Sequence, residues 1–422
     1  MTIYLGTTIL FIAFSYVMLL FFQQFLRARA HQVNFDLKRN LLEKQVNVII
    51  SNNAKPKQEE AAWSGWRKFR VKKIVEENDT IKSFYFVPHD GKPLASFLPG
   101  QHITFQLKVP GQSKPVIRCY TLSNSIKRKN YYRVSIKKQL APLDKKDAPN
   151  GVSSCYFHDE LLEGDVVDVR APSGKFYLDL TEKTPIVLIA GGIGLTPSLS
   201  MLNTLSDVKS SRKIHLLYAV QTKEEQIMEK KLLARQARLP NFSFHRFYGV
   251  CDDSELSKNI HKGYIDCSSM RDLGIEFDSD FYICGPPPMM NAIVEGLEAQ
   301  GVSEQRIHFE SFGPASVSKK SKVKPALTIV GDTNEAKVAH SVSFSLSDKN
   351  VEWDPSQGSV LDIAESAGVD IESGCRAGSC GTCLTAILEG DVSYAEDAGI
   401  DIEKGSCLPC IATPNGPLKL HA

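Results

Sequence analysis

The pattern of apolar and polar residues changes several times along the chain, and its first stretch differs from all the others. Residues 3–22 are mostly apolar and carry no charge, which is about the length that a helix needs to cross a bilayer. Basic residues follow this stretch (Arg27, Arg29, Lys38 and Arg39), whereas nothing basic except the amino terminus precedes it. The positive-inside rule therefore predicts a single transmembrane helix, with the rest of the chain in the cytoplasm.

The segment after this helix is expected to tether a larger folded part. Apolar residues recur at loosely helical intervals over residues 34–50, which fits either an interfacial helix or a spacer, and residues 51–60 form a polar linker. Residues 28–30 have the form of a signal-peptidase site, but the region before the apolar stretch lacks Lys and Arg and Arg27 crowds the site, so cleavage is not expected. We assign residues 1–26 to the anchor and residues 27–65 to a juxtamembrane segment and linker.

Short stretches of alternating character fill residues 66–180, separated by Gly, Pro and Asn. Strands at this spacing are typical of an antiparallel barrel. The expected strands are Ser83–Val87, Ile103–Val109, Tyr131–Lys137 and Asp165–Val169.

The pattern changes again in residues 181–312, where continuous apolar runs alternate with helical stretches. This order is typical of a doubly wound α/β domain with a parallel sheet. The expected strands are Ile186–Ala190, Ile214–Ala219 and Phe281–Cys284, and the expected helices are Ser198–Leu205 and Ile227–Arg238.

A third domain is expected at residues 326–422, after a polar linker at residues 313–325. Two early strands (Ala326–Val330 and Val342–Leu346) and a helical pattern at Ser359–Gly368 predict an α+β fold. Its charge sets it apart, because it holds 15 Asp and Glu against 5 Lys and Arg, a net charge of −10 within a chain of +2. The asymmetry fits electrostatic docking, onto the rest of the chain or onto a basic acceptor, as well as it fits ordinary solvated surface.

Cysteine spacing in this third domain predicts a metal centre. Cys375, Cys380 and Cys383 form C-x4-C-x2-C, and a further cysteine follows well downstream, which is the plant-type arrangement for a [2Fe-2S] cluster. Small residues in the loop let backbone N–H groups face the sulfurs and offset the negative charge of a cluster. Disulfides, a structural zinc site or unliganded thiols are the alternatives. The fourth ligand is Cys407 or Cys410, which form a C-x2-C pair.

Motifs in all three domains resemble known redox modules. Residues 99–102 (PGQH), 118–124 (RCYTLSN), 151–158 (GVSSCYFH) and 171–176 (APSGKF) resemble the flavin domain of the ferredoxin-NADP reductase superfamily. The reductase parts of flavohaemoglobins and of hybrid-cluster-protein reductases are the nearest pattern. Residues 191–197 (GGIGLTP) and 284–290 (CGPPPMM) resemble its nicotinamide domain, and residues 326–422 resemble a plant-type ferredoxin of the β-grasp fold. The ferredoxin resemblance favours Cys410 as the fourth ligand, because the apolar residues after it match that family.

The resemblance implies a set of flavin-binding residues. Arg118 would bind the flavin phosphate, Tyr120 would pack near the flavin ring, and Thr121 would offer a hydroxyl to flavin N5 where the family usually has Ser. The start of a helix would hold the pyrophosphate through Gly151, Val152, Ser153 and Ser154. Phe312 would contact the nicotinamide side of the flavin. FAD is expected rather than FMN, although reductases of the phthalate dioxygenase type have the same domain order with FMN.

The nicotinamide nucleotide is expected at the ends of two strands of the second domain. Gly191, Gly192 and Gly194 would let the backbone approach its diphosphate, with Thr196 at the start of a helix. Cys284, followed by Gly285 and Pro286, would lie close to the site of hydride transfer. No Arg cluster for a 2'-phosphate follows residues 218–221, so NADH is expected rather than NADPH, while Lys223 keeps the second possibility open.

Together these features predict a membrane-anchored, NAD(P)H-dependent iron-sulfur flavoprotein oxidoreductase. Electrons would pass from NADH through FAD and the [2Fe-2S] cluster to a one-electron acceptor, with a membrane-bound oxygenase or desaturase as the leading hypothesis. Hybrid-cluster protein, another soluble redox protein or a quinone are alternative acceptors, and a non-catalytic tethering subunit is the alternative from another class. Nucleic acid is not an expected partner.

Overall fold

The computed structural model describes residues 63–141, 149–312, 340–394 and 398–422. The expected transmembrane helix, both linkers and the strand expected at 326–330 lie outside these residues. Within the described residues, no helix is both long enough and apolar enough to cross a membrane.

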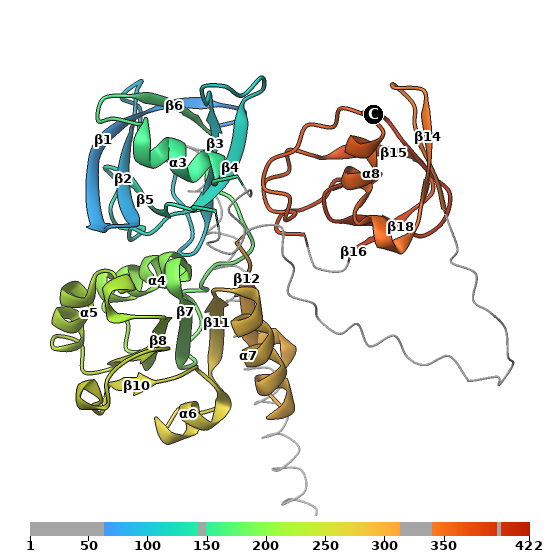
Figure 1. Ribbon diagram of the computed structural model, residues 1–422. Helices are drawn as coiled ribbons and strands as arrows, with labels where there is room; N and C mark the ends of the chain where they lie inside the picture. The colour runs from blue at the N-terminus through green and yellow to red at the C-terminus, as the bar shows by residue number, and fades with distance from the viewer. Residues whose placement is uncertain (1–62, 142–148, 313–339, 395–397) are drawn as a thin grey trace, which may run out of the picture. The chain divides into compact units, whose positions relative to one another are not determined.

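The first domain is the expected antiparallel barrel. Six strands lie in the order β4-β3-β6-β1-β2-β5, and each neighbouring pair is antiparallel. A bridge between Leu122, directly after β4, and Val134 of β5 joins the two outer strands. Helix α3 lies beside the strands of this domain (Figure 1), and its Phe157 belongs to the barrel core, which is rich in Phe. The elements are β1 (Arg67–Asn78), β2 (Ile81–Pro88), β3 (His102–Leu107), β4 (Val116–Thr121), β5 (Tyr132–Lys137), α3 (Val152–Asp159) and β6 (Val166–Val169).

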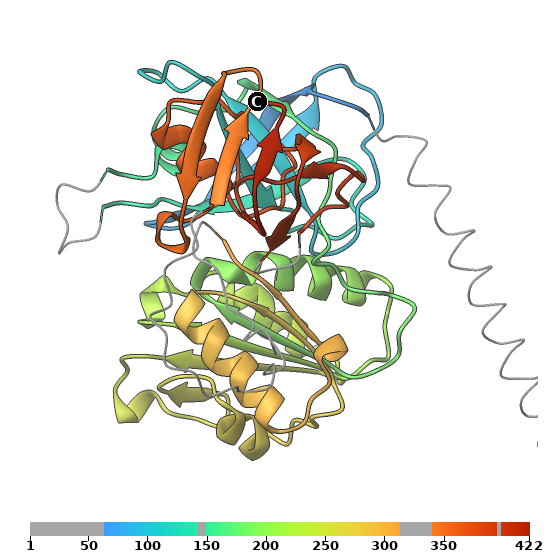
Figure 2. The same cartoon turned by 90° about the vertical axis from the view of Figure 1, so that its right-hand side faces the viewer.

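The second domain is a parallel sheet with helices on both faces. Its order is β10-β9-β8-β7-β11-β12, and each neighbouring pair is parallel. Figure 2 shows α7, in gold, along one face of this sheet. The strands are β7 (Ile186–Gly191), β8 (Ile214–Val220), β9 (Phe242–Tyr248), β10 (Ile260–Lys262), β11 (Asp280–Cys284) and β12 (Ile307–Glu310). The α-helices are α4 (Leu195–Asp207), α5 (Glu229–Gln236), α6 (Cys267–Asp272) and α7 (Pro287–Ala299).

Strand β7 explains why the sequence of this sheet is continuously apolar. Leu188 belongs to the core on the α4 side, whereas Val187 and Ile189 belong to the core under α6 and α7. A strand covered on both faces has no position that favours a polar residue. One expected helix differs in length, because Met228 adopts a left-handed conformation (φ 59°) and α5 begins only after it.

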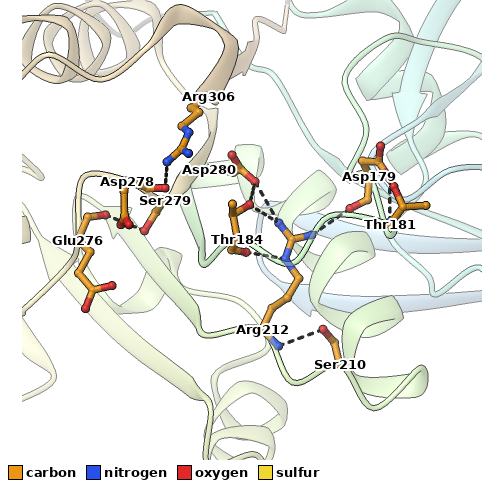
Figure 3. A network of polar contacts seen from close by, with 10 residues as sticks. All are labelled: Asp179, Thr181, Thr184, Ser210, Arg212, Glu276, Asp278, Ser279, Asp280 and Arg306. Atoms are coloured by element: carbon orange, nitrogen blue, oxygen red, sulfur yellow. Dashed lines mark hydrogen bonds and ion pairs between the residues drawn. The ribbon is translucent and has the colours of Figure 1, made fainter. Parts of the chain in front are cut away.

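A buried arginine joins the segment before β7 to the starts of two neighbouring strands (Figure 3). The guanidinium of Arg212 donates to the carbonyl oxygens of Thr184 (2.6 Å) and Asp179 (2.9 Å) and to Oδ2 of Asp280 (3.1 Å). Thr184 donates its hydroxyl to the same carboxylate oxygen. These bonds fix the entry of the chain into the parallel sheet.

The third domain is the expected α+β fold. Its main sheet has the order β14-β13-β19-β15-β17, in which β13 and β19 are parallel, and β16 pairs with β18. Ser359 caps α8 by accepting a hydrogen bond from the backbone N–H of Asp362. The elements are β13 (His340–Phe344), β14 (Lys349–Trp353), α8 (Val360–Ser366), β15 (Thr385–Glu389), β16 (Val392–Tyr394), β17 (Ser406–Cys407), β18 (Ala412–Pro414) and β19 (Leu418–Leu420).

Candidate functional site

A cavity of about 370 Å³ brings together residues that the sequence analysis assigned to different cofactors. The expected flavin contacts Arg118, Tyr120, Thr121 and Phe312 line it. Thr196, expected at the nicotinamide nucleotide, lines it too, as does the expected cluster ligand Cys375, with its loop neighbours Gly374, Ala377 and Ser379. The cavity is therefore where the flavin, nicotinamide and cluster predictions meet.

Strand β4 and helix α3 hold the flavin side of this cavity. The hydroxyl of Tyr120 lies 2.9 Å from that of Ser153, and the Tyr120 ring packs edge-on against Phe157 in the barrel core. Burial raises the pKa of Tyr120 to about 12, so its hydroxyl stays protonated at neutral pH. Gly151 is the residue before α3, as expected. Ser154 already uses its hydroxyl inside the protein, accepting from the N–H of Gln139 and donating to the carbonyl oxygen of Gly151.

The glycine turn after β7 packs directly against the loop after β11. A Cβ on Gly194 would lie 2.2 Å from the carbonyl oxygen of Cys284, so only glycine allows this approach. Gly191 is also close to that loop, whereas Gly192 (φ +54°) has open space beside it. The two nucleotide-binding segments that the sequence predicts, Gly191–Thr196 and Cys284–Pro286, are thus adjacent.

Two buried titratable residues in the cavity were missed by the sequence analysis. His102 and Glu310 lie with Nδ1 and Oε1 3.9 Å apart, and each lines the cavity. Burial lowers the pKa of His102 to about 4 and raises that of Glu310 to about 8, so both are uncharged at pH 7. Glu310 pairs in register with Cys284 on the neighbouring strand, and its Oε2 has no hydrogen-bond partner among the described residues.

Arg118 makes a contact that the flavin-phosphate prediction does not include. Its Nη1 donates to the carbonyl oxygen of Gly374 at 2.9 Å and to that of Ile117 at 2.7 Å. A guanidinium has five N–H donors, so the contact with the cysteine loop leaves donors for a phosphate. The phosphate role of Arg118 stays a prediction.

The cysteine loop surrounds its sulfurs with backbone N–H groups. Sγ of Cys375 accepts from the N–H of Ala377, Ser379 and Cys380 at 3.2–3.4 Å, and Sγ of Cys380 accepts from those of Cys375 and Thr382. Gly378, at φ +67°, supplies a backbone conformation that other residues rarely adopt.

A second pair of sulfurs completes the arrangement. Cys383 and Cys410 place their Sγ atoms 3.1 Å apart, and both residues are buried. Four thiols in two pairs, with amides aimed at the sulfurs, suit an iron-sulfur cluster, whose anionic sulfurs need such donors. Cys407, the competing fourth ligand, is fully buried at the end of β17. Cys410 stays our prediction for the fourth ligand.

Comparison with known proteins identifies the three domains. Residues 68–177 match the oxidoreductase FAD-binding domain, residues 188–295 the oxidoreductase NAD-binding domain and residues 344–415 the 2Fe-2S iron-sulfur cluster binding domain. The chain belongs to the ferredoxin-NADP reductase family, with a C-terminal [2Fe-2S] domain. Its three domains are those of an NAD(P)H-dependent oxidoreductase with FAD and a [2Fe-2S] cluster. The expected cofactors FAD and [2Fe-2S] are confirmed.

Its relatives share different parts of this reductase. A flavohemoprotein of Bacillus thuringiensis subsp. konkukian is 37% identical over 259 residues, which are 61% of this chain and 63% of the relative. The reductase thus spans less than two thirds of such flavohemoproteins. The FAD/NAD-binding domain of a nitric oxide dioxygenase from Vibrio cholerae is 31% identical with a TM-score of 0.53, covering 59% of this chain and 99% of that one.

A phthalate dioxygenase reductase, described as a modular structure for electron transfer from pyridine nucleotides to [2Fe-2S], is similar over a longer stretch. It covers 85% of this chain and 98% of its own, at 25% identity and a TM-score of 0.53. The likeness therefore extends beyond the flavin and nicotinamide domains.

Proposed function

We propose that this reductase is anchored in a membrane, takes electrons from NADH and delivers them to a membrane-bound oxygenase or desaturase. The cavity shared by Arg118, Tyr120, Phe312 and the cysteine loop carries the electron route, because it places the expected flavin contacts beside the expected cluster ligands. A bound FAD would supply the exchange between two-electron hydride chemistry and one-electron transfer, and a [2Fe-2S] cluster would supply one-electron transfer.

The residues of the cavity bind and orient rather than react. Tyr120 and Phe312 bring aromatic rings to the wall of the cavity, where an aromatic cofactor could pack against them, and the hydroxyl of Tyr120 lies within hydrogen-bond distance of that of Ser153. Thr121 is buried at the end of β4 and presents a hydroxyl to the cavity. Cys284 is a small, fully buried residue at the end of β11, and its carbonyl oxygen packs against the glycine turn after β7.

The preference for NADH is supported by ion pairs near the end of β8. Nζ of Lys223 lies 3.4 Å from Glu255, and Nη1 of Arg246 lies 2.5 Å from Glu229. A 2'-phosphate would have to displace these carboxylates from their cations and would meet their negative charge. The ribose hydroxyl of NADH carries no such charge, so it is the better fit.

The donor is tested by anaerobic titration of the full-length protein with NADH or NADPH, followed by visible absorbance and low-temperature EPR. We expect NADH to bleach the flavin and produce a reduced [2Fe-2S] signal at lower concentration than NADPH. Glu255→Gln removes the carboxylate that pairs with Lys223, so it should reduce the difference between the NADH and NADPH concentrations required. Equal efficiency of both nucleotides in the unmodified protein would refute the NADH preference.

The membrane proposal is supported by the apolar residues 3–22 and the basic residues that follow them. An anchor would confine donor and acceptor to one surface and raise their encounter rate. Resistance of the full-length protein to extraction from membranes at high pH, with loss of that resistance on deleting residues 1–26, is the expected result. Extraction of the full-length protein would contradict it, and would favour a soluble acceptor such as hybrid-cluster protein.

A further inference from the structure

A third thiol, from the flavin domain, lies among the expected ligands of the cluster. The Sγ atoms of Cys119, Cys375 and Cys380 all lie within 4.8 Å of one another. Cys119 belongs to β4, whereas the other two belong to the cysteine loop of the C-terminal domain. The [2Fe-2S] ligand pattern of the sequence does not include it, because that pattern is complete without it.

Contacts within the flavin domain and across to the loop hold Cys119 in this place. Its Sγ lies 3.3 Å from the hydroxyl of Thr104, the residue opposite it on β3. The two residues before it also contact the loop, because Ile117 packs against Gly374 and Arg118 donates to the carbonyl oxygen of Gly374. The thiol is therefore positioned by β3 and β4, and it lies where β4 contacts the cysteine loop.

Two ion pairs join the same two domains away from the sulfurs. Nζ of Lys114 lies 2.5 Å from Asp370, and Nζ of Lys175 lies 3.1 Å from Asp401. All four side chains are more than half exposed, so these pairs can be reversed in charge without disturbing a core. They provide a means of weakening the contact without changing Cys119 itself.

We propose that Cys119 is a positioning residue that donates a hydrogen bond from its thiol to the sulfurs of Cys375 and Cys380, and thereby raises the reduction potential of the cluster while the two domains are in contact. Hydrogen bonds to the sulfurs stabilise the reduced cluster, which carries one more negative charge. The amide donors of the loop come from the same domain as the ligands and accompany them everywhere. The bond from Cys119 exists only in the docked arrangement, so the cluster accepts an electron more readily there and releases it more readily after separation. The thiol keeps its proton throughout, and no covalent bond changes.

The inference rests on the proposed electron route, but its test does not need NADH. The midpoint potential of the cluster is measured in the full-length holoprotein by a dithionite titration followed by EPR. Cys119→Val, which keeps the bulk and removes the donor, should lower the potential by up to about 59 mV, a tenfold shift for one electron, and change the EPR g values. Cys119→Ser, which keeps a donor, should stay close to the unmodified protein. An unchanged potential in Cys119→Val would overturn the proposal and leave Cys119 a packing residue.

Docking dependence is tested with Lys114→Glu combined with Lys175→Glu. This double variant should lower the potential to the value of Cys119→Val, and adding Cys119→Val to it should cause no further fall. If Cys119→Val lowers the potential as much in the double variant as it does in the unmodified protein, the docking dependence is overturned. FAD content, measured in every variant, should match that of the unmodified protein. If the cluster potentials of the variants follow this pattern but NADH reduces neither the flavin nor the cluster, the proposed function is contradicted and the role of Cys119 stands.

Discussion

Cys410 places its Sγ 3.1 Å from that of Cys383, although 27 positions separate the two residues in the chain. The neighbouring candidate Cys407 is buried at the end of β17, where it pairs with Thr385 of β15. Only two residues thus separate a cysteine that pairs with a ligand of the cluster loop from one that belongs to the sheet.

This arrangement predicts opposite outcomes for two cysteine replacements. Cys410→Ser should abolish the reduced [2Fe-2S] EPR signal, because it removes one of the two thiols of a pair. Cys407→Ala should keep the signal and cost about 1 kcal/mol or more of stability through a small cavity. In both variants, NADH-driven reduction of a dye that takes electrons from flavin should persist. Retention of the signal in Cys410→Ser and its loss in Cys407→Ala would reverse our assignment of the fourth ligand.

The cysteine loop and the glycine turn could be predicted from the sequence because their chemistry is local. The spacing of Cys375, Cys380 and Cys383 lies within nine residues, and the turn of Gly191–Gly194 directly follows a strand that is apolar throughout. The parallel sheet followed from the same apolar runs, because burial of both faces leaves a clear trace in composition.

Contacts between distant segments left no such trace. Cys119 lies between two expected flavin ligands, and its two cysteine neighbours come from a loop more than 250 positions further along the chain. His102 and Glu310 belong to β3 and β12 of different domains, so no spacing rule could pair them. The late start of α5 is a further case, since a left-handed Met228 is not encoded by the helical pattern that surrounds it.

Arg212 is predicted to be a major contributor to the stability of the nicotinamide domain. Its side chain is 5% exposed and that of Asp280 is 13% exposed, so Arg212→Ala leaves a buried carboxylate without its cation. The loss should be about 3–5 kcal/mol in the free energy of unfolding, measured by chemical denaturation. Lys213→Ala is the matched control, because Lys213 pairs with Glu276 at an exposed site and should contribute at most about 1 kcal/mol. Similar decreases in the free energy of unfolding of the two variants would show that the buried Arg212 network contributes no more than an exposed ion pair.

Two stacked histidines are predicted to make the protein sensitive to acid. His215 and His245 lie on neighbouring strands β8 and β9 with ring centroids 6.2 Å apart, and burial lowers the pKa of each from 6.5 to about 4. Nearby charges act on both groups as well. Lys213 lowers and Glu276 raises the pKa of His215, whereas His261 and Lys258 both lower the pKa of His245. Between pH 6.5 and 4, these two histidines are therefore protonated in the unfolded chain but neutral in the folded protein.

The sign of this effect follows from linkage. The contribution of the two histidines to the free energy of unfolding is fully present above pH 6.5. It falls as the pH drops toward 4, by about 3 kcal/mol for each histidine. His215→Leu should flatten the fall in a series of denaturation curves from pH 7 to pH 4.5. His89→Leu, which replaces an exposed histidine, should leave the slope as it is. A slope that is equally steep in His215→Leu would remove the stacked histidines as its cause.

Glu310 is predicted to control the pH dependence of NADH oxidation. Its carboxyl group is protonated at pH 7, because burial raises its pKa to about 8, and it becomes an anion as the pH rises through that value. Hydride loss leaves a positive charge on the nicotinamide ring, which an adjacent carboxylate stabilises and a neutral acid does not. The turnover of NADH with ferricyanide should therefore rise between pH 7 and pH 9, on the order of tenfold, equivalent to about 1.4 kcal/mol of barrier.

The matched variant for this prediction is Glu310→Gln, which resembles the protonated acid and cannot ionise. Its turnover of NADH with ferricyanide should equal that of the unmodified protein at pH 6.5 and should not rise at higher pH. Because the dye takes electrons from the flavin, the comparison is independent of the cluster and of the acceptor. A rise that persists in Glu310→Gln would assign the pH dependence to another group and leave Glu310 with a packing role beside Cys284.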